Sequence, residues 1–201
     1  MRRAPTLLAL AVLLLGSASP SVYHVDFLIS AGHEGRPASC KAFPDHHCNL
    51  GAAGERAWTP VVANEATRVL RSAGYSVARE PADFGGSYDV IAAVFIHFDG
   101  STAPCSSGAS IGYPSAADRA LAQRWHALYA RSFPFSFQPD NFTDGLRNYY
   151  AYRQVHARKG ALVLELGELS CPAQRAWLAG HLRSDGALIA QFLRGLRGHQ
   201  R

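Results

Sequence analysis

Val90-Ile91-Ala92-Ala93-Val94-Phe95-Ile96 is the stretch that decides the fold. A continuous apolar run of this length is typical of a strand that is covered on both faces, as in a parallel sheet. Two comparable runs, Val25-Asp26-Phe27-Leu28-Ile29 and Ala161-Leu162-Val163-Leu164-Glu165-Leu166, lie on either side of it in the chain. The sequence therefore predicts at least three buried strands.

Helical patterns separate these strands. Thr59-Pro60 is the expected start of a helix over residues 60–73, which Gly74 ends. Ser115 and Asp118 resemble a capping box at the start of the next helix. The remaining expected elements are a short strand at 75–78, a helical stretch at 146–155, and two helices after the last strand, separated near Gly180. Since strands alternate with helices, we expect an α/β single domain with a mostly parallel central sheet and helices on both faces.

The composition limits the function classes. The chain has 201 residues, of which 48% are hydrophobic and 17% charged, and a formal net charge of +5. This is enough apolar material for one core, and it excludes a disordered chain. The positive charge is too small to indicate nucleic-acid binding. No second apolar run approaches the length of a membrane span.

The N-terminus resembles a secretory signal. Met1-Arg2-Arg3 precedes a ten-residue apolar run, residues 6–15, which closes in Gly16-Ser17-Ala18. We expect residues 1–18 to be a cleaved signal peptide, residues 19–201 to form the mature domain, and that domain to be secreted into the periplasm or the cell-wall space without stable membrane insertion.

Four cysteines fit an exported protein, because an even count outside the cytosol favours disulfides. Three pairings are possible, and proximity in sequence favours Cys40 with Cys48, which leaves Cys105 with Cys171. The alternative is a metal site formed by Cys40, His46, His47 and Cys48, although their spacing matches no zinc-finger pattern.

Ionisable residues lie at the ends of three predicted strands. His33 follows the first, His97 follows the central one, and Glu165 lies near the end of the last. Glu55 lies just before the first long helix. Ligands gather at the carboxyl ends of parallel strands, and two histidines with a glutamate form a plausible catalytic zinc set, with the other glutamate as base.

Four segments in this order resemble the zinc-dependent N-acetylmuramoyl-L-alanine amidases of the cell-division and spore-wall type. Ser30-Ala31-Gly32-His33-Glu34-Gly35 is similar to the family's Asp-Pro-Gly-His-Gly-Gly turn, and Gly54-Glu55 precedes Gly74-Tyr75-Ser76-Val77 as in the family. Phe95-Ile96-His97-Phe98-Asp99 resembles its Ser-Ile-His-Ala-Asn/Asp turn. Residues 162–170 resemble the Leu-Val-Glu-x-Gly-Phe-x-Ser-Asn segment that carries the catalytic glutamate.

The resemblance implies that His33, Glu55 and His97 bind one Zn²⁺ per chain and that Glu165 is the general base. Glu65 competes with Glu55 as the acidic ligand, but it would lie mid-helix. Glu168 stands where the family usually has Phe; it is either a second acid of the active site or, as we expect, an exposed loop residue.

The implied function is hydrolysis of the amide between N-acetylmuramic acid and L-alanine in peptidoglycan or muropeptides, by a monomer with no nucleic-acid partner. Two alternatives remain open. One is a secreted zinc peptidase that cleaves within the stem peptide, since the same chemistry hydrolyses any amide. The other is a non-catalytic wall-binding protein on a degenerate amidase fold.

Overall fold

The structure, a computed structural model, describes residues 21–40 and 48–197. Its centre is a five-stranded sheet in the spatial order β3-β2-β5-β8-β6. The first four strands are parallel and β6 pairs antiparallel with β8. The strands are β2 (Phe27–Ala31), β3 (Val77–Glu80), β5 (Ala92–Asp99), β6 (Ser110–Gly112) and β8 (Ala161–Glu168).

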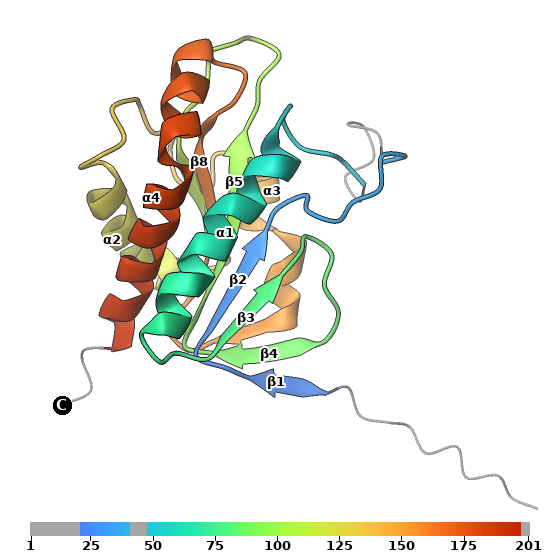
Figure 1. Cartoon of the computed structure of the whole chain (residues 1–201), viewed down its shortest axis with the longest axis vertical. Helices are drawn as coiled ribbons and strands as arrows, with labels where there is room; N and C mark the ends of the chain where they lie inside the picture. The colour runs from blue at the N-terminus through green and yellow to red at the C-terminus, as the bar shows by residue number, and fades with distance from the viewer. Residues whose placement is uncertain (1–20, 41–47, 198–201) are drawn as a thin grey trace, which may run out of the picture.

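Helices cover one face of this sheet. They are α1 (Glu55–Ser72), α2 (Arg119–Tyr129), which follows the 3₁₀ turn η1 (Ala116–Asp118), and α4 (Pro172–Arg197). In Figure 1, α1 and α4 lie side by side across the strands. The alternation of strand side chains sends Ile29, Val94 and Leu164 into the larger apolar core under these helices.

A second, three-stranded parallel sheet lies below the central one in Figure 1. It has the order β1 (Val22–His24), β4 (Ser87–Val90) and β7 (Val155–Ala157). With the short helices α3 (Asp144–Arg147) and η2 (Tyr150–Gln154), it packs on the alternate side chains of the central strands, such as Phe95 and Val163. The prediction of an α/β domain with a mostly parallel sheet and flanking helices is confirmed.

Two predicted helix boundaries, near Pro60 and near Gly180, are wrong. The first helix begins at Glu55, five residues before the expected start, and Pro60 lies inside it. Proline is usually confined to a first turn, so the Thr59-Pro60 pair indicated a start that the tertiary structure overrides. The expected break near Gly180 does not occur, because α4 is continuous from Pro172 to Arg197. A glycine inside a helix costs only about 1 kcal/mol, and the buried apolar face of α4 offsets this cost.

The capping box predicted at the start of α2 is also absent. Ser115 and Asp118 flank the turn η1, and their side chains bond to each other over 2.7 Å instead of to backbone N–H groups. The residues directly after Ser115 form the 3₁₀ turn η1, and α2 starts only after this turn, at Arg119.

Both expected disulfides are present, Cys40–Cys48 and Cys105–Cys171. The first excludes a metal site built on those two cysteines; His46 and His47 lie outside the described residues. The second ties the segment after β5 to the start of α4.

The signal-peptide prediction, residues 1–18, also falls outside the described range and stays a prediction. Between residues 21 and 197, leaving out 41–47, no helix is both long and apolar enough to cross a membrane.

Candidate metal centre

Three of the four predicted site residues meet at the carboxyl ends of the central strands. His33 follows β2, His97 lies near the end of β5, and Glu55 is the first residue of α1. Their potential ligand atoms all lie within 4.8 Å of one another, and all three residues are buried. Within the described ranges, this is the one cluster of histidine, cysteine and acidic side chains with the spacing of a metal site.

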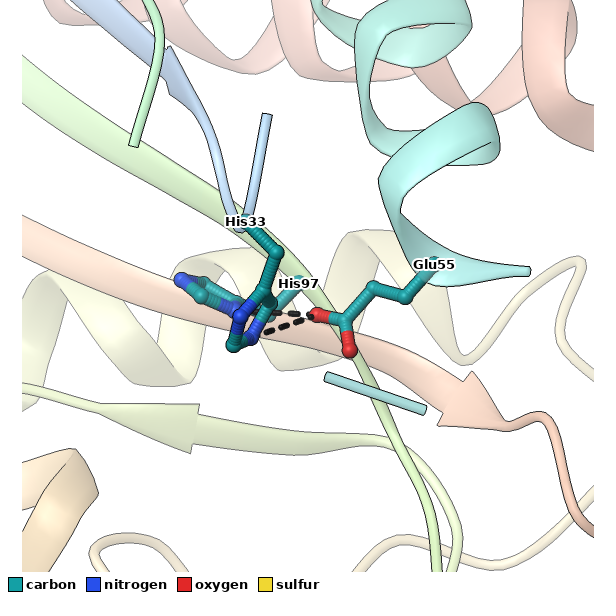
Figure 2. Close-up of side chains that lie close together, drawn as sticks. All are labelled: His33, Glu55 and His97. Atoms are coloured by element: carbon teal, nitrogen blue, oxygen red, sulfur yellow. Dashed lines mark hydrogen bonds and ion pairs between the residues drawn. The ribbon is translucent and has the colours of Figure 1, made fainter. Parts of the chain in front are cut away.

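The Glu55 carboxylate faces both imidazoles. Its Oε1 is 3.0 Å from Nδ1 of His97 and 3.4 Å from Nε2 of His33, as the dashed lines in Figure 2 show. The two rings are perpendicular, with their centroids 4.9 Å apart. One nitrogen of each histidine therefore points at the same carboxylate oxygen.

Glycines at two positions make this approach possible. A Cβ atom on Gly32 would lie 2.3 Å from the His97 ring, and one on Gly51 would lie 2.1 Å from Oε2 of Glu55. Gly51 also has a positive φ of 70°, which side chains disfavour. Any side chain at these two positions would displace a member of the cluster.

Backbone groups hold the Glu55 carboxylate in place. Oε2 accepts a hydrogen bond from the Ala52 N–H over 2.8 Å, and Oε1 accepts one from the Phe98 N–H over 3.0 Å. The second bond links the first turn of α1 to the end of β5.

The Asn49 carbonyl positions His33. Its oxygen lies 3.1 Å from Nδ1 of His33 and accepts a hydrogen bond from Arg36 over 3.0 Å. Arg36 is itself held by both carboxylate oxygens of Asp83, each over 3.0 Å. When Nδ1 of His33 donates to Asn49, its Nε2 keeps a free lone pair toward Glu55.

The electrostatics favour neutral imidazole beside an ionised carboxylate. Burial lowers the pKa of His33 to about 4, although the Glu55 charge opposes this shift. Burial tends to raise the pKa of Glu55, but the hydrogen bond from His97 and the proximity of both imidazoles hold it below its ordinary value. At neutral pH, His33 thus presents a lone pair and Glu55 a negative charge.

These residues fit a zinc ion. Two ligands on a tetrahedral ion, each bonded at about 2.0–2.1 Å, are about 3.3 Å apart. The 3.0 and 3.4 Å separations of the imidazole nitrogens from Oε1 agree with that spacing. Two histidines and a glutamate are also a ligand set of catalytic zinc sites, where the remaining position stays open to water or substrate.

Glu165, the fourth predicted residue, lies next to the cluster on β8. It is the register partner of His97 across the parallel β5–β8 ladder, so the two side chains leave the sheet on the same face. Its Oε2 is enclosed without a hydrogen-bond partner among the residues that the structure describes. Burial, with the charges of Glu55 and Asp99, raises the pKa of Glu165 well above its ordinary value.

The two competing acids have structural roles. Glu65 lies in α1 and pairs with Arg68, with nitrogen–oxygen distances of 3.0 and 2.6 Å, and it is not a member of the cluster. Glu168 is fully buried, so the expectation of an exposed loop residue is wrong. Its carboxylate accepts hydrogen bonds from the N–H groups of Cys105 (2.9 Å) and Ser107 (2.7 Å) and from the Ser170 hydroxyl.

Sequence reasoning missed the groups that surround the ligands. Asn49 acts through its backbone, which leaves no signal in residue type. The Tyr149 hydroxyl lies 3.0 Å from Nε2 of His97, although Tyr149 is far from His97 in sequence. The signal that the sequence did offer was the aromatic group Tyr149, Tyr150 and Tyr152 just before a predicted strand.

Comparison with known proteins places the fold. No family model matches the chain, and no curated protein matches its sequence significantly. One similar solved structure is the catalytic domain of CwlV, an N-acetylmuramoyl-L-alanine amidase from Bacillus (Paenibacillus) polymyxa var. colistinus. It is 17% identical to this chain, with a TM-score of 0.61, and the superposition covers 86% of this chain and 97% of the CwlV domain. The N-acetylmuramyl-L-alanine amidase Ami1 from Mycobacterium smegmatis is also 17% identical, with a TM-score of 0.61 and coverages of 89% and 98%.

A third similar structure is the CwlD amidase from Clostridioides difficile, solved in complex with the GerS lipoprotein. It is 11% identical, with a TM-score of 0.53 and coverages of 86% and 98%. At these identities the likeness shows that the chain has the fold of amidase catalytic domains.

Proposed function

We propose that this chain is a secreted, zinc-dependent hydrolase that cleaves the amide between N-acetylmuramic acid and L-alanine in peptidoglycan. The observation that carries the proposal is the Glu165 carboxylate, which is in register with His97 beside the His33–Glu55–His97 cluster and whose Oε2 has no hydrogen-bond partner in residues 21–40 and 48–197. Amidase catalytic domains have the same fold, and the two disulfides suit a protein that works outside the cytoplasm.

Each ligand residue would offer one particular atom to the metal. His33 would hold the metal through Nε2, His97 through Nδ1 and Glu55 through Oε1, because these are the atoms that face one another. When bound, zinc acts as a Lewis acid that makes a water molecule more acidic and polarises the scissile carbonyl. Glu55 keeps its geometry through the Ala52 and Phe98 N–H groups.

Glu165 would move the proton. Its carboxylate takes a proton from the attacking water as the water oxygen bonds to the carbonyl carbon. The same proton then passes from Glu165 to the amide nitrogen, the carbon–nitrogen bond breaks, and the peptide leaves with a free amine on L-alanine. A raised pKa suits this role, because a carboxylate of higher pKa is the stronger base.

Product analysis tests this function. The mature protein, with its disulfides intact and loaded with zinc, is incubated with purified peptidoglycan and, separately, with a muramoyl tripeptide, each with and without a chelator. Mass spectrometry identifies the new ends. Chelator-sensitive release of peptides that begin with L-alanine is the expected result.

Other products would overturn the proposal. New amines within the stem peptide would show a zinc peptidase. Wall binding by zinc-loaded protein without any new amine would show a binding protein on an amidase fold.

A further inference from the structure

His97 has polar partners at both ring nitrogens. Nδ1 lies 3.0 Å from Oε1 of Glu55, and Nε2 lies 3.0 Å from the Tyr149 hydroxyl. A neutral imidazole carries one N–H and one lone pair, so His97 can donate to only one of these partners at a time.

Two proton arrangements satisfy this geometry. In the first, Nδ1–H donates to Glu55 and the Tyr149 hydroxyl donates to Nε2. In the second, Nε2–H donates to Tyr149 and the Nδ1 lone pair faces the Glu55 carboxylate. Two acceptors 3.0 Å apart repel each other unless a cation lies between them, so metal binding selects the second arrangement.

The Tyr149 hydroxyl can serve both arrangements, because a hydroxyl both donates and accepts. In the second it must place its own proton elsewhere, and the Tyr150 hydroxyl lies 3.4 Å away. Tyr150 in turn donates to the Ala82 carbonyl, which can only accept. In the second arrangement, His97, Tyr149 and Tyr150 therefore each donate to the next group, and the chain of hydrogen bonds ends at the Ala82 carbonyl.

Packing holds the Tyr149 hydroxyl at this position. The Tyr149 ring lies against Phe95, with the ring centroids 5.0 Å apart. It also packs edge-to-face on the His97 ring, with the centroids 5.3 Å apart. Phe95 and His97 are alternate residues of β5 and face the same side of the sheet, so the strand itself aligns both contacts.

We propose that Tyr149 is a positioning residue for His97: its hydroxyl accepts a hydrogen bond from Nε2–H and thereby commits the Nδ1 lone pair to the metal site, while Tyr149 donates its own hydrogen bond to the Tyr150 hydroxyl. This inference rests on the metal site of the proposed function, but not on the identity of the substrate.

The test compares two tyrosine variants of the full mature protein. Tyr149→Phe removes the hydroxyl that lies at His97. The control, Tyr152→Phe, removes a hydroxyl of the same aromatic group that donates to the Leu146 carbonyl over 3.1 Å and does not hydrogen-bond to His97. Zinc affinity is measured by competition with a chromogenic chelator. We expect Tyr149→Phe to weaken it about 10- to 100-fold, the usual effect of losing an outer-shell partner, and Tyr152→Phe to change it less than about 2-fold.

Nitrogen NMR of zinc-loaded, ¹⁵N-histidine-labelled protein gives a readout that folding alone does not move. The expected pattern for His97 is a metal-bound Nδ1 and a protonated Nε2, whose proton exchanges faster with water in Tyr149→Phe. A metal-bound Nε2, equal zinc affinities of the two variants, or no zinc binding by the wild type would overturn the inference. If the expected pattern is found but no L-alanine peptide is released, the positioning role stands and the proposed function fails.

Discussion

Glu165 and Glu168 lie three residues apart on β8, and their carboxylates have opposite surroundings. The Glu165 side chain shares a face with His97, and its Oε2 has no hydrogen-bond partner in the part of the chain that the structure describes. The Glu168 carboxylate accepts three hydrogen bonds, two from backbone N–H groups after β5 and one from Ser170. The β5–β8 ladder shifts register between the two glutamates: His97 pairs with Glu165 and Asp99 pairs with Glu168, so two residue steps along β5 span three along β8. This irregularity at the end of β8 brings Glu168 to the segment after β5 instead of to the metal cluster.

The difference distinguishes a chemical role from a structural one. A buried carboxylate with all its acceptors used is a complete part of the fold, and Glu168 ties the Cys105–Ser107 segment to β8 beside the Cys105–Cys171 disulfide. An unpartnered one is costly to keep, so it is retained where a proton, a cation or a substrate completes it. This difference leads to four predictions, given from the largest expected effect to the smallest.

Glu165→Gln should abolish most of the activity. The amide cannot accept the proton of the attacking water, so the rate of L-alanine peptide release from a muramoyl tripeptide should fall about 1,000-fold. Zinc content, measured by atomic absorption, should stay at one ion per chain, because Glu165 is not among the ligand atoms. A rate within about 10-fold of the wild type would assign the base to another residue.

Glu168→Ala should act on stability. The substitution leaves the N–H groups of Cys105 and Ser107 and the Ser170 hydroxyl without their acceptor, which should lower the free energy of unfolding by about 3–5 kcal/mol in urea titrations with the disulfides intact. Ser170→Ala is the control: it removes the hydroxyl that donates to Glu168 and accepts from the Ser101 N–H, and it leaves the carboxylate bonded to both N–H groups. A loss below about 1 kcal/mol for Glu168→Ala would show that the segment is held by the disulfide alone.

Asp185 in α4 is a buried carboxyl group outside the metal cluster, so its effect should be on stability and not on catalysis. Burial raises its pKa to about 7, against the opposing effect of the Tyr129 hydroxyl, and its Oδ2 has no hydrogen-bond partner in the described part of α4 and its neighbours. The folded state therefore keeps a proton that the unfolded state releases near pH 4, so wild-type stability should fall as the pH rises from about 4 to about 7.

Asp185→Asn removes this pH dependence. Relative to the wild type, the variant should gain stability as the pH rises, by an amount on the order of 3 kcal/mol at pH 8, in urea titrations at pH 4, 6 and 8. The same substitution at the exposed Asp144 reports the background. A difference between Asp185→Asn and wild type that is the same at pH 4 and pH 8 would contradict the shifted pKa.

Ser110→Ala should have the smallest effect. Ser110 is the antiparallel register partner of Glu165, and its buried hydroxyl has no partner among residues 21–40 and 48–197. Because no bond is lost, the free energy of unfolding should change by less than about 0.5 kcal/mol and the rate by less than about 3-fold. A rate loss comparable to that of Glu165→Gln would show that Ser110 orients the carboxylate during turnover.

Much of the fold followed from local patterns. Continuous apolar runs predicted β2, β5 and β8. The histidines at the ends of β2 and β5, His33 and His97, lie in the cluster that the structure forms. The errors came from interactions that local patterns do not contain. Pro60 is accommodated inside α1, and α4 passes Gly180 without a break, because tertiary packing outweighs both local signals.

The site was predictable to the extent that it depends on strand ends. Glu168 was misjudged because its partners come from a segment about sixty residues away that folds back onto β8. Asn49 and Tyr149 reach the histidines only in the folded chain, and neither belongs to a motif. Outer-shell positions of this kind depend on tertiary contacts, and one sequence does not reveal them.

The central claim is that a cation occupies the His33–Glu55–His97 cluster beside Glu165, whereas Glu168 is bonded entirely within the fold. Anomalous X-ray scattering at the zinc edge, recorded from crystals of the zinc-loaded protein, tests it most directly. We predict one peak per chain, bounded by Nε2 of His33, Oε1 of Glu55 and Nδ1 of His97, with the Glu165 carboxylate nearby but not coordinated. A crystal without such a peak, or one in which Glu168 or another site binds the zinc, would contradict the account.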